Sequence, residues 1–375
     1  MILEEKQEII KSEEIDTLIF SGDKVWNIRS QDQEIIRERL IKNAFLHHLD
    51  CSDDYRRFVD RKLRLNAEEL RGVAIEDIPV IPTSAYKENV LLSVDGEDIS
   101  KWCLSSGTKG LRSRVPRDKV SLDRLIGSLN TGSELIQHYY EHEVEVLNLG
   151  PDKYEAGDVW FSYVMSLIEA IYPTTCFIND GVFRIEEVIS ELEFLESENS
   201  DVIISSPPFL VLELVKALME KNIQFNFGNR LTIITAGGWK KRTGEEVSRE
   251  KLVEFCQVCF GIEDNNQFRD IFNQVELNTV VFECSEGKKH LPPWVAAFAR
   301  SPLDLRALPD GEEGLMSFLD ASANSYPCFY VGDDLGVVQH VDCACGISSK
   351  TISINRRVQT RDTRGCATSI MMETE

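Results

Sequence analysis

Residues 201–238, DVIISSPPFLVLELVKALMEKNIQFNFGNRLTIITAGG, contain a strand–helix–strand pattern that decides the expected fold class. The short apolar run 201–206 predicts a strand, and Pro207 and Pro208 suit the start of a helix. This helix would bury one stripe of side chains, formed by Val211, Leu214, Val215 and Leu218. The run 230–238 predicts a second strand that ends in a glycine turn. The pattern is typical of an α/β protein with a largely buried sheet, in which turns after strands often bind ligands.

The rest of the chain repeats this alternation of helices and strands. Helices are expected at 32–50 and 121–142, with Ser121 as a cap, and strands at 143–149, 278–284 and 314–320. Pro79 and Pro82 predict an extended segment. With 375 residues, the chain is long enough for a large core and for more than one structural lobe.

The charge of the chain limits the partners that we expect. Its 63 acidic and 41 basic residues give a formal net charge of −22, which disfavours binding to nucleic acid and to anionic membranes. Residues 1–14 are charged and lack the apolar core of a signal peptide, and no apolar run is long enough to span a membrane. Together with ten cysteines that follow no repeating frame, these features predict a cytoplasmic protein with mostly reduced thiols.

Against this acidic background, SSGTKGLRSRVPRD (105–118) is a small-residue loop that turns basic. Backbone N–H groups exposed by glycines, together with serine and threonine hydroxyls, form a site for anions. The residues that supply this chemistry are Ser105, Ser106, Gly107, Thr108 and Gly110, with charge added by Lys109, Arg112, Arg114 and Arg117. No Gly-Lys-Ser/Thr closes the loop, so it is not that of the P-loop nucleoside triphosphatases. Taken alone, the loop is explained equally well as a solvated turn.

The string SSGTKG resembles the phosphate loop of the adenylate-forming superfamily, which includes acyl-CoA synthetases, adenylation domains and luciferases. The longer string 105–118, with IPVIPTSAYK (78–87) upstream, is similar to one branch of it, the acyl-protein synthetases of bacterial bioluminescence. These are LuxE-type long-chain-fatty-acid–protein ligases. The resemblance covers most of the chain, from Pro79 to Cys366. It implies an α/β fold in which several sheets are packed by helices, as in the large N-terminal domain of adenylate-forming enzymes.

Two further motifs of the superfamily have counterparts in the central part of the chain. In TAGGW (235–239), Gly237 and Gly238 stand where a strand ends in a turn that contacts adenine. In FNQVE (272–276), Glu276 stands in the place of a glutamate that helps to hold Mg²⁺, and Asn273 replaces the usual glycine. The resemblance therefore implies adenine contacts for the two glycines and a metal role for the glutamate.

The next two motifs lie closer to the end of the sequence. FYVGDDLG (329–336) offers Asp333 and Asp334 as the aspartate that binds ribose hydroxyls, and we favour Asp334 because it directly precedes the Leu-Gly pair. NRRV (355–358) offers Arg357 as the arginine that reaches the nucleotide, with an arginine in the place of the family's glycine. The cofactors implied are ATP and Mg²⁺, which would activate a carboxylic acid as an acyl-adenylate with release of pyrophosphate.

The end of the chain carries the expected acyl acceptor. Most members of the superfamily have a C-terminal lid domain with a catalytic lysine, and this chain stops before one. The acyl-protein synthetases share that truncation and carry a cysteine in an Arg-Gly-Cys context, which corresponds to Cys366 in TRGCATSI (363–370). We expect an adenylation domain at 1–335, helical over about 1–75, and a short segment at 336–375 that carries Cys366. The thioester would pass to an NADPH-dependent acyl reductase partner, and an acyl-transferase is a further possible partner.

Several other interpretations stay open. The enzyme could instead load coenzyme A or a carrier protein, or the chain could be a non-catalytic interaction protein, and Cys366 could be an idle thiol. His138, Glu141 and His142 fit the His-x-x-Glu-His pattern of an inverted zincin, which would make a metalloprotease. The pair Cys343 and Cys345 lacks the second pair that a structural zinc site needs, so we interpret it as structural or incidental.

Overall fold

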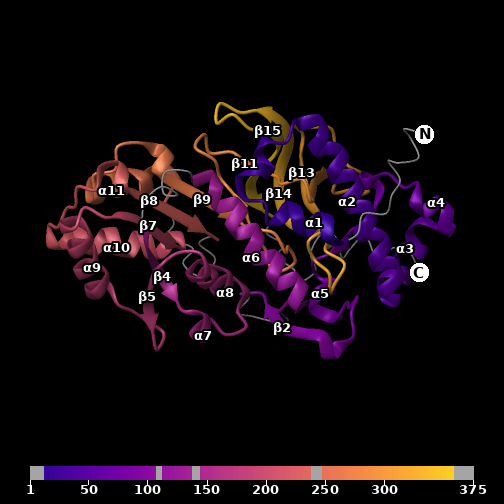
Figure 1. Cartoon of the computed structure of the whole chain (residues 1–375), viewed down its shortest axis with the longest axis horizontal. Helices are drawn as coiled ribbons and strands as arrows, with labels where there is room; N and C mark the ends of the chain where they lie inside the picture. The colour runs from indigo at the N-terminus through magenta and orange to yellow at the C-terminus, as the bar shows by residue number, and fades with distance from the viewer. Residues whose placement is uncertain (1–11, 107–111, 137–143, 238–246, 359–375) are drawn as a thin grey trace. The chain divides into compact units, whose positions relative to one another are not determined.

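The computed structural model describes residues 12–106, 112–136, 144–237 and 247–358 (Figure 1). The chain divides into two compact units. The first unit contains residues 1–131, 274–281 and 288–375, and the second contains residues 132–273 and 282–287. Within the described ranges, none of the helices combines the length and the apolar character needed to cross a membrane.

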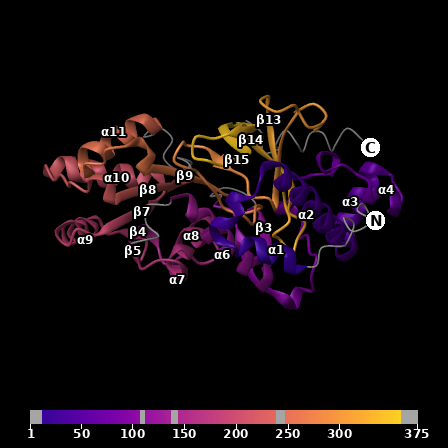
Figure 2. The ribbon, with the colours of Figure 1, turned by 45° about the horizontal axis from the view of Figure 1, so that its top comes forward.

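The first unit is built on a six-stranded sheet with the order β11-β15-β14-β13-β12, and β1 pairs with β14 (Figures 1 and 2). Its strands are β1 (Ile81–Pro82), β11 (Lys289–His290), β12 (Val295–Arg300), β13 (Glu313–Asp320), β14 (Phe329–Asp342) and β15 (Ser348–Arg357). A separate hairpin pairs β2 (Ile99–Leu104) with β3 (Arg114–Asp118). The helices are α1 (Ser12–Ile19), α2 (Ser30–Cys51), α3 (Asp53–Leu63), α4 (Ala67–Arg71), α5 (Ala85–Glu88) and α6 (Lys119–Ser133), the last of which continues to the boundary of the second unit.

The second unit has a mostly parallel sheet with the order β10-β9-β8-β7-β4-β5-β6. Its strands are β4 (Val144–Pro151), β5 (Thr174–Asn179), β6 (Val182–Phe183), β7 (Asp201–Ser206), β8 (Leu231–Ala236), β9 (Phe268–Phe272) and β10 (Val281–Phe282). The helices are α7 (Lys153–Ala156), α8 (Trp160–Ser166), α9 (Ile185–Ser197), α10 (Pro208–Lys221) and α11 (Arg249–Phe260). The predicted strand–helix–strand pattern is confirmed as β7, α10 and β8.

The α10 helix shows why this unit folds as the sequence predicts. Pro208 occupies its first turn, where a missing N–H costs nothing, and Asn222 ends it in the left-handed conformation. The predicted stripe is buried in one continuous apolar core with side chains of β4, β7, β8 and α11. Burying an aliphatic side chain of this kind contributes about 1.5–3 kcal/mol, so the stripe fixes the helix against the sheet.

Two sequence expectations are wrong in detail. Ser121 does not cap its helix, because Asp118 Oδ1 accepts the Ser121 N–H at 2.9 Å, while the serine hydroxyl accepts N–H bonds from Asn324 and Ser325. The run 278–284 forms only the two-residue strand β10. The apolar residues of this run are buried, which explains the pattern that suggested a strand. Asn278 at its start is held by side-chain hydrogen bonds instead of a strand ladder.

Candidate functional site: a buried acidic cluster and two glycine-containing turns

The pleat of β14 separates the two candidate ribose-binding aspartates. From Asp333 to Val338, alternate residues of this strand are buried, so Asp334 is 8% exposed while Asp333 faces the other way and is half-buried. Asp334 pairs across the sheet with Arg357 of β15, and Arg357 Nε lies 3.8 Å from Asp334 Oδ1. The same guanidinium lies 4.0 Å from Asp333 Oδ2. The structure thus brings the predicted pair Asp334 and Arg357 together.

Gly336, two residues beyond, is required by close packing. A Cβ atom there would lie 2.2 Å from the carbonyl oxygen of Ser353 and 2.9 Å from Met316 Sδ. A bulge between Leu335 and Gly336 also shifts the register of β14 against β15 at this point. The Leu-Gly pair therefore shapes the strand next to Asp334, because only a glycine lets β15 approach so closely.

Gln274 and Tyr330 complete an acidic cluster that the sequence did not reveal. The Gln274 amide donates to Asp334 Oδ2, and its own Oε1 is buried without a hydrogen-bond partner in the part of the chain that the structure describes. The Tyr330 hydroxyl is also buried and has no hydrogen-bond partner among the described residues. Burial raises the pKa of Tyr330 well above its usual value, and nearby acidic groups, among them Glu276 and Asp334, add to the shift. We call Gln274, Glu276, Tyr330 and Asp334 the acidic cluster.

The backbone around Glu276 is held by Arg117, a residue of the basic stretch 105–118. Its side chain is 5% exposed, and its carbonyl oxygen accepts bonds from the Tyr326 hydroxyl at 3.2 Å and from Cys328 Sγ at 2.9 Å. Arg117, fully buried on β3, donates to the carbonyl oxygens of Val275 at 2.8 Å and Leu277 at 3.2 Å. The backbone on both sides of Glu276 is therefore fixed.

This contact corrects the expectation for the loop charges. Arg117 also donates to Asn278 Oδ1 at 2.9 Å and to the Tyr326 hydroxyl at 3.1 Å, so it is committed to the protein interior. Arg114, three residues before it, lies over the Trp102 ring with its guanidinium carbon 3.9 Å from the ring centroid. Arg117 is thus a structural residue and is not available to an anion at the loop.

The phosphate-loop candidates are only partly described. Ser105 and Ser113 close the base of the loop: the Ser105 N–H donates to the Ser113 carbonyl and the Ser113 N–H donates to Ser105 Oγ, both at 3.0 Å. Ser106 follows at the edge of the described segment. The remaining candidates, Gly107, Thr108, Lys109 and Gly110, lie outside the described residues. So do Gly238, Cys366 and the His138, Glu141 and His142 pattern.

In the second unit, the candidate adenine turn follows β8. Gly237 has a φ of +75°, which favours glycine, and a Cβ there would lie 2.8 Å from the Phe161 ring. Directly after the neighbouring strand β9, the side chain of Asn273 accepts a hydrogen bond from Trp160 Nε1. The residue that replaces the family's glycine thus makes a specific contact. Gly237 and Asn273 follow the carboxyl ends of adjacent parallel strands, the edge at which α/β sheets bind ligands.

Comparisons with known proteins show the family of the chain. Residues 1–374 match the family described as acyl-protein synthetase, LuxE. The chain is 39% identical to the long-chain-fatty-acid–luciferin-component ligase of Aliivibrio fischeri and 40% identical to that of Vibrio harveyi, with 97% of this chain and 95% of each relative covered.

Solved structures show the fold. A structure of 2-hydroxyisobutyryl-CoA ligase with 2-HIB-AMP and CoA superposes with a TM-score of 0.68 at 11% identity, covering 96% of this chain and 75% of that one. A long-chain-fatty-acid-CoA ligase of Archaeoglobus fulgidus gives a TM-score of 0.50 at 15% identity, with 78% and 56% covered. The fold is that of the adenylate-forming ligases, as the sequence predicts. The chain belongs to the acyl-protein synthetase family LuxE and is a ligase of that type.

Proposed function

We propose that this ligase activates a fatty acid with ATP and transfers the acyl group to its own Cys366. One observation carries the proposal: a chain of this family places a buried carboxylate, Asp334, between the Gln274 amide and the Arg357 guanidinium. A carboxylate held in this way accepts bonds from vicinal hydroxyls such as those of a ribose. Gln274 Oε1 and the Tyr330 hydroxyl, which lack partners among the described residues, suit a polar ligand at the same place.

The proposed reaction has two steps. An oxygen of the fatty carboxylate attacks the α-phosphorus of ATP, the bond to the bridging oxygen breaks, and pyrophosphate leaves with that electron pair. The Cys366 thiolate then attacks the acyl carbonyl carbon, a thioester forms, and AMP leaves. The phosphates would be held by the loop that Ser105 closes, and adenine by the turn at Gly237. Arg357 would contact the nucleotide beside the ribose.

A metal ion fits the same set of residues. Glu276 supplies carboxylate oxygens, which Mg²⁺ prefers, and its backbone is fixed on both sides. Bound there, Mg²⁺ would neutralise negative charge on the triphosphate. We propose that the thioester is then delivered to a reductase partner, because a thioester keeps the acyl group activated for reduction.

The test is intact mass with peptide mapping after incubation with Mg-ATP and acids from acetate to myristate, with aryl acids as well. We expect an ATP-dependent, hydroxylamine-labile adduct on Cys366 and pyrophosphate release with long acids. Cys366→Ser should lose the adduct, and Cys51→Ser, which removes an exposed thiol, should keep it.

Two other results would change the assignment. Acid-dependent pyrophosphate release with no adduct on Cys366 would keep the adenylation step and identify an external acceptor, such as coenzyme A or a carrier protein. The absence of both the Cys366 adduct and pyrophosphate release with every acid would overturn the proposed activity. That result would favour a role as a non-catalytic interaction protein.

A further inference from the structure

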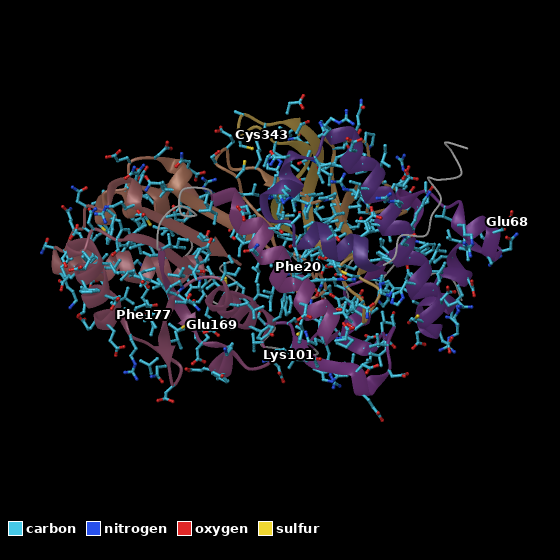
Figure 3. The ribbon with its side chains drawn as sticks, in the orientation of Figure 1. Phe20, Glu68, Lys101, Glu169, Phe177 and Cys343 are labelled. Carbon is cyan, nitrogen blue, oxygen red and sulfur yellow. The ribbon has the colours of Figure 1, made fainter. Side chains whose placement is uncertain are left out.

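The loop that joins β14 to β15 carries Cys343 and Cys345 close to a buried histidine. Figure 3 labels Cys343 in this region of the first unit. His290 lies on β11, which pairs with β15 so that His290 is opposite Thr351. The candidate ligand atoms of His290, Cys343 and Cys345 all lie within 4.8 Å of one another, and Cys345 Sγ is 3.4 Å from His290 Nε2. The histidine is the partner that the Cys-x-Cys pair lacked in the sequence.

The distance between Cys345 Sγ and His290 Nε2 matches a tetrahedral zinc ion. With Zn–S near 2.3 Å and Zn–N near 2.0–2.1 Å, a sulfur and a nitrogen on one tetrahedral zinc lie about 3.5 Å apart. The loop holds both cysteines in a tight turn: the Cys343 N–H donates to the Ile347 carbonyl and the Gly346 N–H donates to the Cys343 carbonyl, both at 3.0 Å. Gly346 has a φ of +91°, which favours glycine at this point of the turn.

The histidine is oriented as a metal ligand should be. Its Nδ1 lies 2.8 Å from Ser349 Oγ, and that hydroxyl donates its own proton to the Lys350 carbonyl at 3.2 Å. Ser349 Oγ therefore accepts from Nδ1–H, which leaves the lone pair of Nε2 facing the thiols. Metal-ligating histidines almost always have their second nitrogen held in this way. The imidazole is fully buried.

His290, Cys343 and Cys345 supply three of the four positions around a tetrahedral zinc ion. Zinc sites with three protein ligands hold a water molecule in the fourth position.

We propose that His290, Cys343 and Cys345 bind one zinc ion that fastens the β14–β15 loop to β11. Thiolate and imidazole ligands in this number favour zinc over the hard cations that bind oxygen. Each thiol releases its proton to solvent when it coordinates the metal, so binding should release protons. The zinc site has a structural role and is separate from the acidic cluster.

The test uses the full chain, reduced and treated with a chelator. Wild type should take up about one Zn²⁺ or Co²⁺ per chain, and Co²⁺ should give the intense visible bands and the near-ultraviolet sulfur bands of tetrahedral thiolate coordination. Cys343→Ser and Cys345→Ser should lose these sulfur bands in part and bind at least about tenfold more weakly. Cys51→Ser, an exposed cysteine of the same unit, is the matched control and should bind like wild type.

One more variant keeps the test decisive if a ligand variant misfolds. Ser349→Ala leaves all ligands in place and should weaken metal affinity about tenfold or more, because the histidine loses its orienting partner. The proposal is overturned if the reduced wild-type chain takes up neither metal, if Cys343→Ser and Cys345→Ser bind as wild type does, or if fresh protein is metal-free with a Cys343–Cys345 disulfide.

Discussion

Two buried polar clusters of the first unit differ in whether their oxygen atoms have hydrogen-bond partners. Around Arg117, Nε and Nη2 of the guanidinium donate to two backbone carbonyls, the Asn278 side chain and the Tyr326 hydroxyl. In the acidic cluster, Gln274 Oε1 and the Tyr330 hydroxyl have no partners among the described residues. Unpaired buried oxygens cost free energy, so a fold retains them where a ligand pairs them. The difference supports the assignment of the Arg117 cluster to the fold and the proposal that the acidic cluster binds a ligand.

The largest effect should come from breaking the Arg117 cluster. Arg117→Met leaves the Val275 and Leu277 carbonyls and the Asn278 side chain without their donor, and we expect the free energy of unfolding to fall by about 3–5 kcal/mol. Urea denaturation would measure the loss. Arg114→Met on the same strand is the control, because that side chain is exposed and lies over the Trp102 ring. The free energy of unfolding should fall by less than about 1 kcal/mol in this variant. Equal losses in the two variants would contradict the assignment of Arg117 as the anchor.

The next effect tests the acidic cluster and the choice between the two aspartates. Asp334→Asn keeps the shape of the side chain but removes the charge that strengthens hydrogen bonds to hydroxyls. ATP-dependent pyrophosphate release should fall about 10- to 100-fold, since a charged hydrogen bond contributes about 1.5–3 kcal/mol. Asp333→Asn, on the opposite face of the strand and 4.0 Å from the same Arg357, should lose less than about threefold. A larger loss for Asp333→Asn would transfer the ribose role to that residue.

These two clusters also mark what the sequence could and could not predict. Local patterns sufficed for β7, α10 and β8, because burial of one helical stripe and one sheet face repeats along a short stretch. They also favoured Asp334 over Asp333. In the structure the pleat of β14 buries Asp334 and leaves Asp333 half-buried. Whether Asp334 binds ribose is still a prediction.

Contacts between distant segments were beyond the sequence. Arg117 meets Asn278 across 161 positions, so a residue that looked like part of a basic loop is an interior anchor. Gln274 meets Asp334 across 60 positions, and His290 meets Cys345 across 55. No periodicity reports such pairs, because they depend on which strands become neighbours in the sheet. The division expected at residue 335 is still a prediction, although residues 336–357 contribute to β14 and β15.

The smallest effect separates two buried tyrosines that differ in the hydrogen bonding of their hydroxyl groups. Tyr326→Phe removes a hydroxyl that accepts a hydrogen bond from Arg117 and donates one to the Glu276 carbonyl. The free energy of unfolding should therefore fall by about 1–2 kcal/mol. Tyr330→Phe removes a hydroxyl with no described partner, and stability should stay the same or rise by up to about 1 kcal/mol. If a ligand uses that hydroxyl, the Kd for ATP should nevertheless rise about threefold to tenfold. Urea denaturation measures the free energy of unfolding of both variants, and nucleotide titration measures their Kd for ATP. A Tyr330→Phe variant that loses stability but binds ATP normally would assign Tyr330 to the scaffold.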